Sequence, residues 1–123
     1  MRITNTGDID FQLEASWEEV RILHQVLNEV CNGLRIENFE KTIGDMDAAK
    51  IEMSNLRALY ADSNARKDSR RISIHMTPSL IEICRNALAR VQMEIDDWDF
   101  ETRLGASKQQ VQSMLDVFHK ALA

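Results

Sequence analysis

The chain has few cysteines and glycines, no long apolar run and no excess of positive charge. No stretch approaches the roughly 20 apolar residues that a membrane helix requires, and residues 1–8 lack the apolar core of a secretory signal. The glycines form no phosphate-binding loop. A net charge of −5 opposes general attraction to nucleic acids or anionic membranes. We therefore expect a cytoplasmic protein whose principal partner is neither a membrane nor a nucleic acid.

Residues that usually carry catalysis or bind metals are sparse and scattered. Cys31 and Cys84 lie in apolar helical patterns without metal-ligand spacing, so they are predicted to be reduced core thiols. The three histidines are isolated, and no Ser/His/Asp or His/Cys set can be placed from spacing. The acidic segment Asp96–Asp99 around Trp98 lacks the further donors of a calcium loop, which favours a helix end followed by a turn. We predict no enzyme activity, no metal site and no cofactor.

The first half of the chain reads as a strand and two helices. Alternating apolar residues from Ile9 to Ala15 predict a half-buried strand. Ser16 with Glu19 forms a capping box for a helix over about 17–32, which Gly33 is placed to end. Residues 36–43 fit either a strand or an irregular segment. A second helix then follows Asp45, its predicted N-cap, with inward-facing residues Ala49, Met53, Leu56 and Tyr60.

The same order of events returns in the second half. Residues 72–76 alternate as a strand, Thr77 and Pro78 open a helix, and apolar residues follow at helical spacing over 81–95. After Gly105 the correspondence slips by one residue, so that Asp45 matches Ser107 as a second N-cap. Up to Gly44, six pairs are identical at an offset of 61: Ile22/Ile83, Leu27/Leu88, Val30/Val91, Phe39/Phe100, Glu40/Glu101 and Gly44/Gly105.

These patterns predict an α+β fold of two tandem β–α–corner–α repeats related by a pseudo-twofold axis, with four main helices packed on a small sheet. A single domain spans 1–123, with repeat one at about 9–61, a linker at about 62–70 and repeat two at about 71–123. The only basic cluster, Arg66, Lys67, Arg70 and Arg71, falls in or beside that linker. Each unit is too small to bury its apolar faces alone. We expect a monomer with an internal pseudo-twofold, or a homodimer.

The most specific local motif is Phe-Glu-x-x-[Ile/Leu]-Gly, which occurs once in each half. We expect its phenylalanine to anchor the core, its glycine to supply a turn with positive φ, and its glutamate to bind a backbone group or a cation. A structural corner is the favoured interpretation. The alternative is one small-molecule site formed by both glutamates near the pseudo-twofold. The candidate corner or interaction residues are Phe39, Glu40, Gly44, Phe100, Glu101, Arg103 and Gly105.

The spacing Leu104-Gly105-x-Ser107-x3-Val111-x3-Leu115 is similar to the core of a helix-turn-helix. The first helix would span 98–104 and the recognition helix 108–122. The recognition helix would offer Lys108, Gln109, Gln110 and Gln112 to bases but little charge to neutralise phosphates. A transcriptional regulator is therefore the alternative function, using residues 98–118.

The segment Leu27-Asn28-Glu29-Val30-Cys31-Asn32-Gly33, followed by Phe-Glu-x-x-[Ile/Leu]-Gly, resembles a pattern in small uncharacterised bacterial proteins. The second half gives the fuller corner, Phe100-Glu101-Thr102-Arg103-Leu104-Gly105, but replaces the polar Asn28, Glu29 and Asn32 with Ala89, Arg90 and Met93. The resemblance implies a bacterial origin, a cytosolic location and no assigned activity. Our leading hypothesis is a small non-enzymatic protein that binds another protein. An immunity- or antitoxin-like inhibitor is one form of it.

Overall fold

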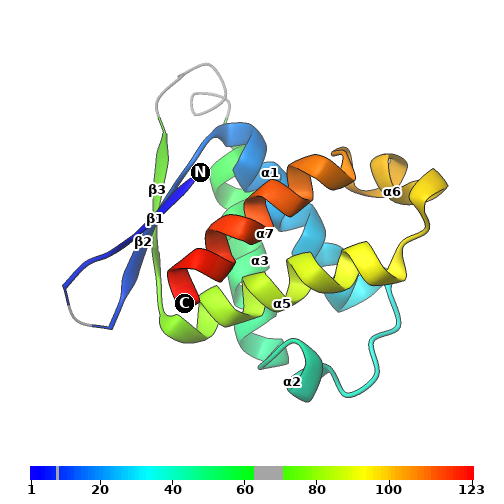
Figure 1. The fold of residues 1–123 in the computed structure, drawn as a ribbon, viewed down its shortest axis with the longest axis horizontal. Helices are drawn as coiled ribbons and strands as arrows, with labels where there is room; N and C mark the ends of the chain where they lie inside the picture. Colours follow the sequence, from blue (N-terminus) through cyan, green and yellow to red (C-terminus); the bar gives the residue numbers. More distant parts are fainter. Residues whose placement is uncertain (8, 63–70) are drawn as a thin grey trace.

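A computed structural model describes residues 1–7, 9–62 and 71–123 (Figure 1). These residues form a mixed α+β fold in which a small antiparallel sheet packs at one end of a helical layer. The predicted α+β class is confirmed. Arg66, Lys67 and Arg70 of the basic cluster lie outside the described residues, as does most of the predicted linker.

The sheet has three strands in the order β1 (Arg2–Asn5), β2 (Phe11–Ala15) and β3 (Ile72–Met76). Strand β2 pairs antiparallel with both neighbours, and Leu13 lies opposite Ile74. The prediction that the strand begins at Ile9 is wrong. Strand β2 begins two residues later because a hairpin turn, closed by the Thr6 N–H bonding to the Asp10 carbonyl at 3.0 Å, holds the exposed Ile9.

The described residues form six α-helices, of which four are long. The long helices are α1 (Trp17–Asn28), α3 (Met46–Ala61), α5 (Pro78–Glu94) and α7 (Lys108–Leu122). Two short helices, α2 (Phe39–Thr42) and α6 (Asp97–Leu104), precede α3 and α7. Residues 39–42 are thus helical rather than extended. This turn forms because Asn38 adopts a left-handed conformation with φ 52° and the following phenylalanine is buried.

The four long helices begin where the sequence places their N-caps. The side chains of Ser16, Asp45, Thr77 and Ser107 each accept a hydrogen bond from the backbone N–H three residues later. Pro78 occupies the first turn of α5, where its missing N–H leaves no partner unsatisfied. Each cap stabilises its helix by about 1 kcal/mol relative to alanine. These predictions, which rest on local chemistry, are confirmed.

Helix α1 does not stop at Asn28 but continues as a π-helical turn, η1 (Glu29–Gly33). The Leu34 N–H donates to the Glu29 carbonyl at 2.7 Å across this wider turn. The predicted end at Gly33 is confirmed, although the π geometry was not predicted. Turns of this kind occur often at functional sites.

The core lies between the sheet and the helices. Helix α1 packs mainly on α3, α5 packs mainly on α7, and α7 also contacts β1. The element order β2–α1–α2–α3 matches β3–α5–α6–α7 in the described part of the chain. None of the helices described there is long and apolar enough to cross a membrane. The largest fully buried side chains include Leu13, Leu23, Leu27, Leu56, Met76, Ile81, Leu88, Phe100 and Phe118.

Candidate functional site

The two Phe-Glu-x-x-[Ile/Leu]-Gly motifs form the turns α2–α3 and α6–α7. Their phenylalanines are buried, and Gly44 and Gly105 adopt φ values of 144° and 65°. The predicted roles of phenylalanine and glycine are confirmed. A Cβ added at Gly44 would lie 2.7 Å from Cγ1 of the buried Ile83, whereas one at Gly105 would meet the Arg21 guanidinium at 2.9 Å. Both positions therefore need glycine for its conformation, and Gly44 also needs it for space.

The two motif glutamates behave differently. Glu40 accepts a hydrogen bond from the Met46 N–H at 3.1 Å and so joins its corner to the start of α3. Glu101 is exposed and makes no side-chain hydrogen bond within the described residues. Helices α2 and α6 lie well apart in Figure 1, so the two glutamates do not converge on one site.

Arg103 connects the second corner to the π-turn of the first half. Its guanidinium donates to the Glu29 carboxylate at 2.5 Å and lies 3.8 Å from Asp99. The hydrogen bond to Glu29 is the main cause that raises the pKa of Arg103. Gly33 makes room for this pair, because a Cβ there would lie 2.3 Å from Oε2 of Glu29. The structure thus brings together the two motifs that the sequence singled out separately.

Each corner is also fastened by the first helix of the other half. Gln25 on α1 donates to the Arg103 carbonyl at 3.1 Å, and Asn86 on α5 donates to the Ile43 carbonyl at 2.9 Å. Arg21 donates to the Gly105 carbonyl at 2.8 Å. These side chains satisfy carbonyls that a helix end leaves without an intrahelical partner. The corners therefore join the two halves of the fold.

Helices α6 and α7 coincide with the predicted helix-turn-helix, but most of the polar side chains assigned to base reading bond within the protein. Lys108 pairs with Asp97 and lies 5.5 Å from the centre of the Phe100 ring. Gln110 completes the α7 capping box, and Gln112 donates to Asp116 at 2.8 Å. Only Gln109 of the four remains without such a bond in the described residues. This arrangement weakens the case for DNA reading.

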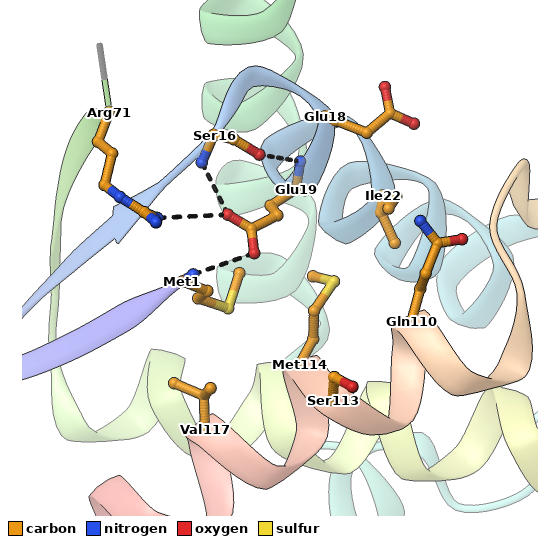
Figure 2. Close-up of a pocket in the computed structure, with 10 residues that line it drawn as sticks. All are labelled: Met1, Ser16, Glu18, Glu19, Ile22, Arg71, Gln110, Ser113, Met114 and Val117. Atoms are coloured by element: carbon orange, nitrogen blue, oxygen red, sulfur yellow. Dashed lines mark hydrogen bonds and ion pairs between the residues drawn. The ribbon is translucent and has the colours of Figure 1, made fainter. Parts of the chain in front are cut away.

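A cavity of about 510 Å³ opens between the start of α1 and α7 (Figure 2). Of the two carboxylates that line it, Glu19 accepts hydrogen bonds from the Ser16 N–H at 2.8 Å and the Met1 amino nitrogen at 3.1 Å, with Arg71 at 3.7 Å. Burial raises the pKa of Glu19, but these bonds outweigh burial and hold it below its ordinary value. Glu19 thus joins the N-terminus to the start of α1 at the wall of this cavity. The apolar wall of the cavity is formed by Ile22, Met114 and Val117.

Two features of the surface were not predicted from the sequence. Met93 and Trp98, at the junction of α5 and α6, are 72% and 81% exposed. A separate polar cleft between α1 and α3 is lined by His24, Asn28, Asn32 and residues of α3. The spacing of four residues between these side chains places them on one helix face, a signal that the sequence contained.

Within the described residues, no group of three or more His, Cys, Asp and Glu side chains is arranged to hold a metal ion. Cys31 and Cys84 are both free; Cys84 is buried as predicted, but Cys31 is only half-buried. No protein-family model and no curated protein matches the chain, and no solved structure matches its fold.

Proposed function

We propose that this chain is a tandem duplication whose halves are related by a pseudo-twofold axis, and that it acts by binding a partner protein at the α5–α6 end. The duplication is supported by sheet register: Leu13 and Ile74, which correspond at an offset of 61, lie opposite each other in the antiparallel pair. A twofold axis that passes between β2 and β3 would place equivalent residues opposite each other in this antiparallel pair.

The contacts between the halves are reciprocal, as a twofold axis would require. Gln25 and Asn86 correspond at the offset of 61, and each donates to a corner of the other half. The α1–η1 helix, 17–33, and α5, 78–94, have the same bounds at that offset. The corner motif is therefore assigned a structural role, joining two units that could not bury their faces separately.

The observation that carries the binding proposal is the exposure of Trp98. A tryptophan side chain exposes a large apolar area, and tryptophan is enriched among the residues that dominate binding energy at protein interfaces. The other tryptophan, Trp17, is half-buried and donates to the Tyr60 carbonyl at 2.5 Å. Trp98 thus differs from Trp17 in being directed to solvent.

The surroundings of Trp98 indicate the chemistry of the partner. Met93, five residues earlier in the sequence, is a second exposed apolar side chain, and Asp96 and Asp97 lie between them. Apolar anchors inside a charged rim are the usual anatomy of an interface. The complementary surface is an apolar pocket bordered by lysine or arginine. Helix α6 lies at the end of the molecule opposite the sheet, where such a surface can approach it (Figure 1).

The proposal is tested by capture from an extract of the source cells with Trp98→Ser beside the unmodified protein. Ile51→Ser is the matched control, because Ile51 is a similarly exposed apolar residue on α3. A partner retained by the control and lost with Trp98→Ser supports the proposal. For the purified partner, a blue shift of Trp98 fluorescence on mixing is expected in a Trp17→Phe background. Equal capture by both serine variants would refute the assignment of this surface.

A further inference from the structure

The cleft between α1 and α3 has a volume of about 430 Å³ and a polar lining. Helix α1 contributes His24 and Asn28, the π-turn η1 contributes Asn32, and α3 contributes Met53, Ser54, Arg57 and Tyr60. It shares no lining residue with the α5–α6 surface described above. An occupant of this cleft is therefore a question separate from the protein partner.

His24 is the least satisfied side chain of the cleft. It is only 8% exposed, its ring lies 5.0 Å from that of Tyr60, and its Nδ1 has no hydrogen-bond partner. Burial, and then the charge of Arg57, lower the pKa of His24, so the ring is neutral at pH 7. The neutral His24 ring and the nearby Tyr60 ring therefore give the cleft an aromatic wall rather than a second charge.

Unpaired positive charge borders the same cleft. Five described arginines pair with carboxylates, namely Arg2, Arg21, Arg71, Arg90 and Arg103. Arg57 makes no ion pair in the described part of the chain, and the same holds for Lys50, seven residues earlier on α3. Lys50 is close enough to Cys31 to oppose the rise in that thiol's pKa. Of these two cations, Arg57 lines the cleft, so its positive charge is available to a bound anion.

The amides of Asn28 and Asn32 complete the set of donors. Asn32 donates to Oδ1 of Asn28 at 3.0 Å, which orients both side chains and leaves the Asn28 amide N–H groups without a partner among the described residues. A planar guanidinium beside amide donors is suited to a carboxylate, which arginine binds through two parallel hydrogen bonds. The aromatic rings of His24 and Tyr60 suit a flat apolar body attached to it.

We propose that this cleft binds the carboxylate of a small organic acid, with Arg57 and Asn28 holding the carboxylate and His24 and Tyr60 lining the site of its apolar part. The proposed duplication supplies an internal comparison. The positions equivalent to His24, Asn28 and Asn32 are Arg85, Ala89 and Met93, so the unit folds with other residues there. These polar side chains are therefore not required by the fold.

The test is a titration of the purified ¹⁵N-labelled chain with sodium benzoate, followed by backbone amide shifts. Saturable shifts over residues 24–32 and 53–60 are expected below about 20 mM, the range that a ligand of this size reaches. Arg57→Gln is expected to weaken binding by about tenfold or more. Asn28→Ala, which introduces the residue found at the equivalent position 89, is expected to weaken benzoate binding less than Arg57→Gln does. Arg35→Gln is the matched control, because Arg35 is also exposed and has no described ion pair.

Inorganic phosphate is titrated in parallel to separate a carboxylate site from a general anion site. Benzoate shifts that vanish with Arg57→Gln and persist with Arg35→Gln support the proposal. It is overturned if the cleft amides do not move, if the shifts survive Arg57→Gln, or if phosphate moves the same amides at lower concentration than benzoate. None of these outcomes depends on a protein partner, so failure here leaves the binding role of Trp98 untouched.

Discussion

The pair formed by Arg103 and Glu29 makes a quantitative prediction about how the two halves are held together. Replacing Arg103 with methionine keeps most of the volume of the side chain but removes the positive charge. The Glu29 side chain is 9% exposed, so its carboxylate would be left unpaired in a largely buried place. Breaking a fully buried ion pair costs about 3–5 kcal/mol. Because Arg103 is 29% exposed, solvent compensates in part, and we expect a loss of about 2–3 kcal/mol.

Urea denaturation followed by circular dichroism measures this loss directly, and a fall in Tm of about 10 °C should accompany it for a chain of this size. Arg90→Met is the matched control. Arg90 is 30% exposed and pairs with Glu94, whose carboxylate is itself exposed, so its removal should cost less than about 0.5 kcal/mol. The two variants make the same substitution at equal exposure and differ in the burial of the partner.

A double-mutant cycle with Glu29→Gln identifies the interaction itself. Once Glu29 is neutral, Arg103→Met should cost about 1–2 kcal/mol less than it does in the unmodified chain, because no buried charge is then left unpaired. Equal losses for Arg103→Met and Arg90→Met, or additive losses in the cycle, would show that the pair does not fasten the corner to the π-turn.

Three further predictions concern single positions. Gly44→Ala should cost about 3 kcal/mol and Gly105→Ala about 1 kcal/mol in the same urea assay, since only Gly44 combines its φ of 144° with a buried neighbour 2.7 Å from the added Cβ. Burial raises the pKa of Glu52, whose Oε1 lacks a partner, so stability should fall as pH rises above the ordinary glutamate range, and Glu52→Gln should flatten that slope in urea titrations from pH 4 to 8. Burial raises the pKa of both thiols, and Cys84 is fully buried. A disulfide reagent should therefore label Cys31 slowly and Cys84 only when the chain unfolds.

The sign of the Glu52 effect follows from proton binding. Between the ordinary pKa and the raised one, the unfolded chain has lost the Glu52 proton while the folded chain keeps it. The folded state is therefore favoured at low pH and loses that advantage as pH rises through the folded-state pKa. His24 and Glu19, whose pKa values are lowered, act in the opposite direction, so the comparison with Glu52→Gln isolates one group. A slope unchanged by the substitution would refute the assignment.

Local chemistry was the part of this structure that the sequence could predict. The caps at Ser16, Asp45, Thr77 and Ser107 depend on a side chain and a backbone N–H three residues apart, so both partners are visible in the sequence. The positive φ of the corner glycines was predictable for the same reason. The class of the fold followed from the order and periodicity of these segments.

Contacts between distant segments were not predictable in this way. Arg103 and Glu29 are 74 residues apart in the chain, and nothing local shows that an arginine within one corner motif meets a glutamate in the other half. Whether residues 36–43 are strand or helix could not be decided from the sequence, because a left-handed asparagine and a buried phenylalanine form the helix at 39–42 and neither is a helix signal. The α1–α3 cleft was missed because its cation, Arg57, lies on α3. Only the packing of α3 against α1 brings Arg57 and His24 into the same cleft.

The proposed duplication allows residues that both halves need for folding to be told apart from surface residues that differ between the halves. Positions that correspond at the offset of 61 and are buried in both halves are apolar in both, as Leu27 with Leu88 and Phe39 with Phe100. Two exposed pairs differ in character: Trp98 corresponds to Glu37, and Met93 corresponds to Asn32. Since both units adopt the same order of elements, folding cannot account for these differences. The first unit has a polar cleft where the second has an apolar residue, and the second has a tryptophan where the first has a charge. The first half thus provides the control for the second: replacing Trp98 with glutamate should leave the free energy of unfolding within about 0.5 kcal/mol of the unmodified chain while removing the proposed partner binding.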